Sequence, residues 1–496
     1  MKLTRVPTPD RNADLGTYDA VLCLLSDAPP AAALARLPYA ASLKKLLNRT
    51  AAKPGQAVGV HLPNKNQTLA VLALAKKGAS VFEQHQLAGR AVREVLKAKP
   101  RRVLVLGAAR SADMRELVQG GILALLSQSF ELPRFQSAKD AAAKPRVLTR
   151  IDVCDDGSSE LQRLAIEARA QNLARWLTSL PPNKMDAKGY RRSILQLARR
   201  HGLRFRWFDE SKLRRLGAGA FLAVAAGNAR RDAAAIAQLS YRPRGRASAK
   251  PALALVGKGI LFDTGGTNLK PHRSMLDMHI DMAGSAVALA TLIALAEARA
   301  PVAIDAWLAI TENRIGPTAY IPQQIVTAAN GTTIQVIHTD AEGRMALADT
   351  LALASRSGVP LLIDYATLTG AAVYALTERM SALLCNQAEL TQELLTAGAV
   401  SGERLVAFPM DEDFDSDLES KVADIMQCTV EGKGDHMLAA RFLQRFVPKG
   451  RAWAHIDLAA AQRSGGLGLV ASDITGFGVR LTLRWFAARY SRRRAK

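Results

Sequence analysis

The stretch "PALALVGKG" (251–259) decides the fold class of this chain, because it is a near-continuous apolar run of strand length. It is followed by "AGSAVALATLIALAEAR" (283–299), which has the length and small apolar residues of a buried helix, and by "VAIDAWLAI" (302–310), a second strand-like run. Apolar strands separated by helices are typical of a mostly parallel sheet that helices cover on both faces. The sequence therefore predicts an α/β fold with such a central sheet.

The same alternation extends to both sides of this region. The sequence predicts a strand in "TIQVIHTD" (333–340), a helix in "GRMALADTLALASRSG" (343–358) and a strand in "VPLLIDYATLTG" (359–370). Upstream, "SELQRLAIEARAQNLARWLTSL" (159–180) predicts a long helix that stops before a Pro-Pro pair. Ligands of such sheets bind beyond the carboxyl ends of the strands, so function is expected there.

The N-terminal part of the chain predicts a separate, smaller α/β domain. The polar, Ala-rich stretch "SAKDAAAKPRV" (137–147) ends near a proline and resembles the approach to a linker. We therefore expect an N-terminal basic α/β domain at 1–150 and a larger domain at 151–496. Within the first domain, the predicted strands are "DAVLCLL" (19–25) and "RRVLVLG" (101–107), and the predicted helices are "NQTLAVLALAKKG" (66–78) and "GRAVREVLKAK" (89–99).

The composition limits the cellular compartments in which we expect the protein. No run approaches the roughly 18 consecutive apolar residues of a membrane-spanning helix, and the first residues lack the apolar segment of a secretory signal. The four cysteines are scattered and form no C-x-x-C motif, which argues against a disulfide framework or a thiolate zinc site. We expect a cytoplasmic protein that has no membrane partner.

The net charge of +23 is concentrated at the two ends of the chain. Residues 1–150 carry 24 Lys and Arg against 10 Asp and Glu, and residues 480–496 carry seven basic residues and no acidic one. Such an excess can attract nucleic acid or an anionic membrane surface. The alternative, which we favour, is a solvated basic face in a chain rich in Arg and Ala.

Charged residues gather at the predicted strand ends. The stretches that carry them are "VGKGILFDTGGTNLKP" (256–271), "MLDMHIDMAGS" (275–285) and "IHTDAEGR" (337–344). Four of their carboxylates are placed at such ends, together with two lysines and an arginine: Asp263, Asp281, Asp340, Glu342, Lys258, Lys270 and Arg344. Four carboxylates that converge must be neutralised by protons or cations, and divalent metals prefer oxygen ligands. Two metal ions about 3.5–4 Å apart would also generate a hydroxide nucleophile and polarise a carbonyl.

Three alternatives stay open for individual residues of this set. Asp340 or the preceding threonine could simply cap the following helix, with Arg344 as a surface partner. Lys258 could be an unprotonated nitrogen ligand of a metal, or an ammonium that forms salt bridges with the acids. The glycines of "GKG" and "DTGG" lack the spacing of a phosphate-binding loop, so nucleotide binding is weakly supported.

These motifs, taken together and in order, resemble the leucyl aminopeptidase (cytosol aminopeptidase) family of dinuclear metallo-exopeptidases. The resemblance rests on "VGKGILFDTGG", "LKP", "MLDMHIDMAG", "TDAEGR" and "ATLTGA", with further similarity in "SLPPNKM" (179–185), "GAGAFLAVAAGN" (217–228) and "AWAHIDLA" (452–459). It covers roughly residues 160–480, whereas residues 1–150 are similar only in general character. It implies that 151–496 is a metallo-aminopeptidase catalytic domain.

The resemblance assigns roles to residues of this chain. Lys270 would polarise the substrate carbonyl and steady the oxyanion, and Arg344 would hold a bicarbonate that serves as general base. The implied cofactors are two divalent ions per subunit, with zinc or manganese expected before magnesium or cobalt. The implied metal ligands are Lys258, Asp263, Asp281, Asp340 and Glu342, and the implied lining of the substrate pocket is Met278, Thr367 and Gly370.

The chain departs from the family pattern in places. His338 stands where the signature usually has Asn, Gln324 replaces a usual Asp, and Ile321 a usual Arg. "GDHMLAARFL" (434–443) replaces a small-residue stretch near the pocket. The first three could alter packing around the metal ligands and thus metal affinity. The last leaves substrate preference open.

The function expected from this reading is a metal-dependent aminopeptidase that releases N-terminal residues from peptides through water activated by two metals. The resemblance also implies a homohexamer built as a dimer of trimers. Two alternatives remain: a nucleic-acid-binding protein on an aminopeptidase scaffold, with weak DNA binding through its basic ends, and a catalytically silent structural member.

Overall fold

The computed structural model describes residues 1–10, 15–26, 37–50, 53–107, 112–137, 147–155, 157, 159–229 and 233–491. Most of the stretch predicted to approach a linker (137–147) and the last five residues of the basic C-terminal tail lie outside these ranges. The chain forms two compact units. Unit 1 comprises Met1–Arg169, Ala399–Gly402 and Ser464–Thr475, and unit 2 comprises Ala170–Gly398, Glu403–Arg463 and Gly476–Lys496.

Unit 1 is built on a six-stranded sheet in the order β1-β6-β5-β2-β4-β3. All neighbouring strands are parallel except β3 and β4. The helices α3 and α4 contribute to one apolar core and α2 to another, on the alternate residues of the strands. The elements are β1 (Lys2–Arg5), β2 (Ala20–Leu25), α2 (Ala40–Thr50), β3 (Ala57–His61), β4 (Leu69–Leu74), α3 (Val81–Lys97), β5 (Arg102–Gly107), α4 (Ala112–Gln128) and β6 (Arg150–Cys154).

One predicted element of unit 1 is wrong. The helix predicted at 66–78 is instead the strand β4, which pairs with β2 on one side and β3 on the other. A short apolar run that is buried on both faces has no helical or strand period of its own, so tertiary pairing decides its conformation. The strands predicted at 19–25 and 101–107, and the helix predicted at 89–99, are confirmed.

Unit 2 contains an eight-stranded sheet in the order β15-β14-β17-β13-β9-β10-β8-β7. Its centre, from β17 to β10, is parallel, and antiparallel pairs flank it on both sides. The predicted α/β class with a mostly parallel central sheet is confirmed. The strands are β7 (Arg204–Asp209), β8 (Ala235–Tyr241), β9 (Leu253–Asp263), β10 (Ile304–Asn313), β13 (Leu361–Ala366), β14 (Ser381–Cys385), β15 (Leu405–Ala407) and β17 (Ala452–Asp457).

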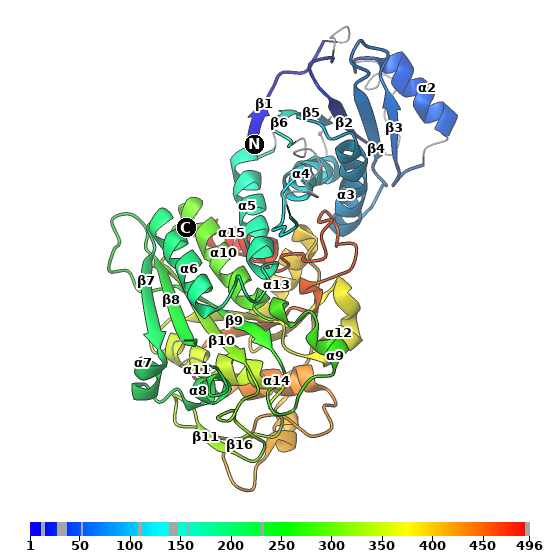
Figure 1. The fold of residues 1–496 in the computed structure, drawn as a ribbon. Coiled ribbons are helices and arrows are strands. Elements are labelled where there is room, and N and C mark those ends of the chain that lie inside the picture. The colour runs from blue at the N-terminus through cyan, green and yellow to red at the C-terminus, as the bar shows by residue number, and fades with distance from the viewer. Residues whose placement is uncertain are drawn as a thin grey trace. The chain divides into compact units, whose positions relative to one another are not determined.

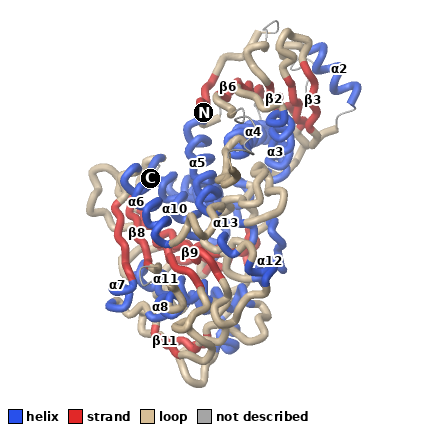
Figure 2. Tube along the Cα trace, in the orientation of Figure 1, coloured by secondary structure: helices blue, strands red, loops and turns tan. Residues whose placement is uncertain are grey.

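Helices cover both faces of this sheet (Figures 1 and 2). The helix α10 (Ala283–Glu297) packs on β9, β10 and β13 and against α15 (Val479–Ser491). The helix α11 (Glu342–Ser355) packs on β9 and β10 together with α8 (Gly219–Ala225) and α14 (Asp435–Gln444). Because α10 and α11 are buried along nearly their whole length, they present little polar surface. The sequence predicted both helices, and it predicted burial for α10.

The chain contains further helices besides those that cover the two sheets. The helix α5 confirms the segment predicted at 159–180. Their bounds are α5 (Leu161–Thr178), α6 (Ala187–Arg200), α7 (Glu210–Arg215), α9 (His272–Met275), α12 (Gly370–Leu376) and α13 (Ala388–Ser401), with short 3-10 turns η1 (Met278–Ile280), η2 (Thr377–Arg379), η3 (Glu412–Leu418) and η4 (Ala459–Ala461).

The strand predicted at 333–340 needs a correction. Only β12 (Thr333–Gln335) is a strand, and it belongs to a separate three-stranded sheet with β11 (Ile325–Thr327) and β16 (Ile425–Met426). Residues 336–341 form an irregular connection to α11, because their polar groups bond to loops rather than to a neighbouring strand. The acidic motif therefore does not follow a strand of the central sheet.

The stretch His272–Glu297 is long and apolar enough to cross a membrane, with a mean hydropathy of 1.6 over its most apolar window. Within the protein, 89% of that window is buried. Burial of this extent is that of a core helix that packs on the central sheet.

Candidate metal centre and active site

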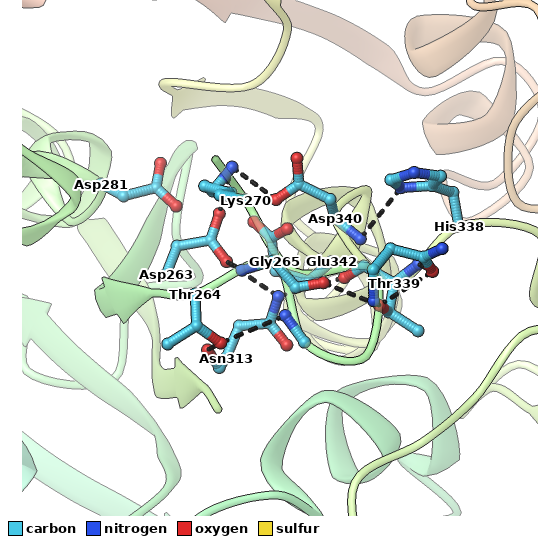
Figure 3. Close-up of polar contacts among 12 residues, drawn as sticks. Asp263, Thr264, Gly265, Lys270, Asp281, Asn313, His338, Thr339, Asp340 and Glu342 are labelled. Atoms are coloured by element: carbon cyan, nitrogen blue, oxygen red, sulfur yellow. Dashed lines mark hydrogen bonds and ion pairs between the residues drawn. The ribbon is translucent and has the colours of Figure 1, made fainter. Parts of the chain in front are cut away.

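The seven charged residues that the sequence singled out come from four places in unit 2. Lys258 and Asp263 lie on β9, and Lys270 lies in the Gly-rich loop that follows. Asp281 lies between η1 and α10. Asp340, Glu342 and Arg344 lie in the connection to α11 and in its first turn, and Figure 3 shows the four carboxylates and Lys270 facing a common region.

Asp263 is held in place by groups on both sides of it. Its Oδ1 accepts hydrogen bonds from the backbone N–H of Gly265 and from Nδ2 of Asn313, both at 2.8 Å. Its Oδ2 lies 2.9 Å from Nζ of Lys270. Asn313, at the end of β10, also donates to the carbonyl of Thr339, and so ties β9 to the acidic motif. The sequence reading missed Asn313, although a polar residue at a strand end is the signal that found the others.

Three carboxylates form a tight group. One ligand oxygen of each of Asp263, Asp340 and Glu342 lies within 4.8 Å of the others. Lys270 pairs with Asp263 and Asp340. Converging carboxylate oxygens with this separation can bind a divalent cation.

A second group lies beside the first and shares Glu342 with it. Nζ of Lys258 lies 2.9 Å from Oδ1 of Asp281 and 2.9 Å from Oε1 of Glu342, and it donates to the carbonyl of Thr367 at 2.9 Å. The hydroxyl of Thr367 in turn donates to Asp281 at 2.6 Å. Among the described residues, Oδ2 of Asp281 and Oε2 of Glu342 are buried and have no hydrogen-bond partner. Two buried acceptors without donors are suited to cations.

Two glycines make this arrangement possible. A Cβ at Gly343 would lie 2.4 Å from Cε and 2.6 Å from Nζ of Lys258, so only a glycine lets that side chain reach Glu342. Gly265 has a φ of +86°, and a Cβ there would lie 2.5 Å from the carbonyl oxygen of Asn268 and 3.0 Å from Oδ1 of Asp340. Both glycines thus make room for the side chains of the site.

The electrostatics show an excess of buried negative charge. Burial, followed by the neighbouring carboxylates, raises the pKa of Asp281 and Glu342 to about 7 and that of Asp340 to about 6. For Lys258 and Lys270, burial alone would lower the pKa, but the adjacent carboxylates outweigh it and raise the pKa of both amines. The carboxylates would therefore hold protons or cations near neutral pH, as expected for a metal centre.

Arg344 lies two residues after Glu342 in α11 and pairs with a carboxylate outside the two groups. Its side chain is 2% exposed, and its NH2 group donates to both carboxylate oxygens of Asp435 at 2.7 and 2.8 Å. Its NH1 group donates to the carbonyl of Gln427 at 3.2 Å. The interpretation of Arg344 as a surface partner is wrong, since the side chain is buried. Asp435 and Gln427 were missed because both are distant in sequence.

The helix-cap interpretation of the acidic motif is also wrong. The N-cap of α11 is Ala341, which has no side chain able to cap. The hydroxyl of Thr339 instead accepts from the backbone N–H of Asn268 and donates to the carbonyl of Gly265. Asp340 pairs with Lys270. The motif therefore organises the loop after β9 rather than the start of its own helix.

The residues that depart from the family pattern differ in their distance from the site. Nδ1 of His338 accepts from the backbone N–H of Asp340 at 3.2 Å, and burial, aided by the charge of Lys270, lowers the pKa of this imidazole. His338 is therefore neutral and steadies Asp340. Gln324 accepts from the backbone N–H of Ile321 in an exposed turn. Of the expected pocket residues, Thr367 contacts Lys258 and Asp281 directly, whereas pocket roles for Met278, Thr367 and Gly370 stay predictions.

A buried network supports the loop that carries Thr367. Asp457, at the end of β17, accepts from the backbone N–H of Leu368 at 3.0 Å and from the hydroxyl of Thr369 at 2.7 Å. Asp457 is thus a structural residue at the end of its strand. The bonds hold the β13–α12 loop and therefore the carbonyl that receives Lys258.

Comparison with known proteins agrees with this site. Residues 172–483 match the family model described as the cytosol aminopeptidase family, catalytic domain. The chain is 38% identical to a probable cytosol aminopeptidase of Syntrophotalea carbinolica, over 82% of this chain and 80% of that protein. It is 36% identical to one of Synechococcus sp. (strain CC9605), over 88% of this chain and 89% of that protein.

A solved structure shows the same fold over nearly the full length. The bottromycin maturation enzyme BotP in complex with Mn is 29% identical, has a TM-score of 0.81, and is matched over 95% of this chain and 99% of that one. The class defined by the fold and the site is that of the metal-dependent peptidases. The chain belongs to the cytosol aminopeptidase family and is an aminopeptidase-type hydrolase.

Proposed function

We propose that this protein is a dinuclear metallo-aminopeptidase that removes N-terminal residues from peptides. The observation that carries the proposal is the pair of adjacent carboxylate groups that share Glu342, one with Asp263 and Asp340 and the other with Lys258 and Asp281. The buried carboxylate oxygens without donors fit two cations better than one, because the two groups are distinct yet adjacent. Zinc and manganese are the favoured ions, and the solved relative that carries Mn supports manganese.

The metal ligands are proposed to be Asp263, Asp340 and Glu342 at one position and Lys258, Asp281 and Glu342 at the other. When bound, the ions would activate water and polarise the scissile carbonyl. Lys258 is an ammonium in its ion pairs, so it must release a proton before its nitrogen can ligate a metal.

Lys270 is proposed to act on the substrate. The loop that carries it turns through Gly265 and Gly266 at positive φ and brings its amine to Asp263 and Asp340. It carries a positive charge that nearby carboxylates stabilise. An ammonium in this position can donate to the oxygen on which negative charge develops during amide hydrolysis, and so lower the barrier of the step.

The loops around the site are proposed to determine substrate specificity. Met278 precedes Asp281 by three residues, and Gly370 follows Thr367 by three, so both lie on segments that also carry site residues. We propose that these residues line the pocket for the first side chain of the peptide. A homohexamer and a cytoplasmic location are further proposals, which the resemblance and the names of the relatives support.

The test combines metal analysis with a panel of aminoacyl amides. The purified protein should contain two divalent ions per chain and cleave aminoacyl chromogenic amides, and a chelator should abolish this cleavage. In Glu342→Gln, which keeps the size of the side chain, the shared ligand loses its charge, and both metal content and turnover should fall. Retention of both ions with unchanged turnover would show that the assignment is wrong. The same assay separates this function from a catalytically silent structural role.

Nucleic-acid binding is a second candidate, and it rests on charge alone. Residues 1–150 carry a net charge of +14, and the last 17 residues carry +7. Phosphate contacts release counterions, so specific binding would weaken steeply with salt yet persist near physiological ionic strength. DNA affinity of the full chain should exceed its heparin affinity there. Equal and weak affinity for both polyanions would reduce the basic ends to a solvated surface.

A further inference from the structure

The guanidinium of Arg344 already pairs with an anionic side chain of the protein itself. Its NH2 group contacts both oxygens of Asp435, and its NH1 group donates to a backbone carbonyl. Among the described residues, its Nε–H is buried and has no hydrogen-bond partner. The positive charge of Arg344 is therefore matched within the chain, and three of its five N–H groups are used by the contacts with Asp435 and Gln427.

This arrangement does not suit the bicarbonate that the family resemblance implies. A planar anion binds a guanidinium best through two parallel N–H groups. Both parallel N–H pairs of a guanidinium include NH2, and NH2 of Arg344 already donates to Asp435. An incoming anion would therefore find only the separate Nε–H and the second N–H of NH1. The carboxylate of Asp435 would also repel a bicarbonate placed beside it. A bicarbonate could enter only after Asp435 had left.

The structure holds Asp435 toward Arg344 by its place in the fold. It is the first residue of α14, and it follows Gly434, whose φ of +61° turns the chain into the helix. The Asp435 side chain is 22% exposed against 2% for Arg344, so its carboxylate lies at the edge of the site, where solvent and substrate have access. Asp435 lies within "GDHMLAARFL" (434–443), the stretch that departs from the family pattern.

The fold places Asp435 beside the charged residues of the candidate site. Its partner Arg344 lies in the first turn of α11, two residues after Glu342. One oxygen of Glu342 lies within 4.8 Å of ligand oxygens of Asp263 and Asp340. Asp435 therefore lies at the edge of this site rather than on a remote surface.

We propose that the carboxylate of Asp435 replaces bicarbonate as the anion on Arg344, so that this enzyme carries its own general base. The proposal rests on the proposed aminopeptidase function. In amide hydrolysis, the water oxygen bonds to the carbonyl carbon, and the C–N bond breaks. Asp435 accepts a proton from that water and returns it to the departing amine nitrogen, so the carboxylate is unchanged at the end of the cycle.

The first prediction of this proposal concerns the unmodified enzyme. In carbon-dioxide-depleted buffer, the metal-loaded protein should cleave an aminoacyl amide at its full rate, and added bicarbonate should leave kcat unchanged. Isothermal titration should detect no bicarbonate binding. A strong rise of kcat with bicarbonate, or a bicarbonate complex of the unmodified protein, would overturn the proposal.

Two variants then separate the charge of Asp435 from its volume. Asp435→Ala vacates the space, so kcat should fall by about 10²-fold or more, as loss of a general base does, and bicarbonate should bind and restore activity. Asp435→Asn fills the same space without the charge, so it should be equally slow and bicarbonate should not rescue it. An Asp435→Ala enzyme of normal or higher activity without bicarbonate would show that the carboxylate is only structural or blocks the site.

The fold provides a matched control on the same helix. Asp415 forms a bidentate pair with Arg441 of α14 at 2.7 Å, with 24% and 9% exposure of the two side chains. Asp415→Ala should lower stability much as Asp435→Ala does, but leave kcat and its independence of bicarbonate unchanged. If the unmodified protein had no aminopeptidase activity with metal bound, the proposed function itself would fail, which is a different result from bicarbonate dependence.

Discussion

The contact between Gly343 and Lys258 offers the sharpest test of how the site is built. In Gly343→Ala, the new Cβ would lie 2.4 Å from Cε and 2.6 Å from Nζ of Lys258. Carbon atoms pack at about 3.5–4.0 Å, so the lysine must move by roughly 1 Å. At present its Nζ lies 2.9 Å from both Asp281 and Glu342. The displacement would break these ion pairs.

The expected change in stability of Gly343→Ala follows from two opposing contributions to the free energy of unfolding. Loss of a partner from a buried ion pair costs about 3–5 kcal/mol. Alanine is favoured over glycine inside a helix by about 1 kcal/mol, so helix propensity alone would make this substitution stabilising. The net expectation is a loss of about 2–4 kcal/mol, because the contact outweighs the propensity. At about 2 °C per kcal/mol for a large domain, Tm should fall by roughly 4–8 °C.

The assay is calorimetry of the chelator-treated protein, followed by metal counting after reloading. Gly370→Ala is the stability control, because a Cβ there would meet only Cε2 of Tyr374 at an ordinary 3.7 Å, and it too lies in the first turn of a helix. Its Tm should stay the same or rise slightly. If Gly343→Ala kept its Tm and its full metal content, the close packing of Lys258 on α11 would be refuted as a constraint on the site.

Three further predictions address single groups of the site. Lys270→Ala should lower kcat by about 10²–10³, as removal of an oxyanion donor does, while both metals stay bound, and a normal kcat would exclude Lys270 from the mechanism. Asn313→Ala removes the 2.8 Å bond that orients Asp263, so metal affinity measured by titration should fall by about 10–100-fold, and unchanged affinity would make Asn313 dispensable. The pKa values of Asp281 and Glu342 are raised to about 7, and that of Asp340 to about 6. Protonated carboxyls do not ligate metals, so apparent metal affinity should decline as pH falls from about 7.5 to 5.5, and an affinity independent of pH over this range would contradict the buried, charge-crowded site.

The sequence by itself determined the helices and strands whose run of apolar residues matches their burial in the folded protein. The strand β9 and the helix α10 were predicted because each is apolar over its full length, and such stretches have few ways to escape water. The seven charged residues were also predicted to lie together, because they follow apolar segments whose ends meet at one edge of a parallel sheet, and the family resemblance assigned them to one site.

Tertiary structure decided what depends on neighbours far away in the chain. The run 66–78 became β4 because two strands pair with it, and residues 336–341 became a connection because Asn268 and Gln427 bond to it. The partner of Arg344 was likewise decided by the fold, since Asp435 lies 91 residues away. A sequence pattern reports the period of burial along one segment, whereas these contacts depend on which segments the folded chain brings within hydrogen-bond distance.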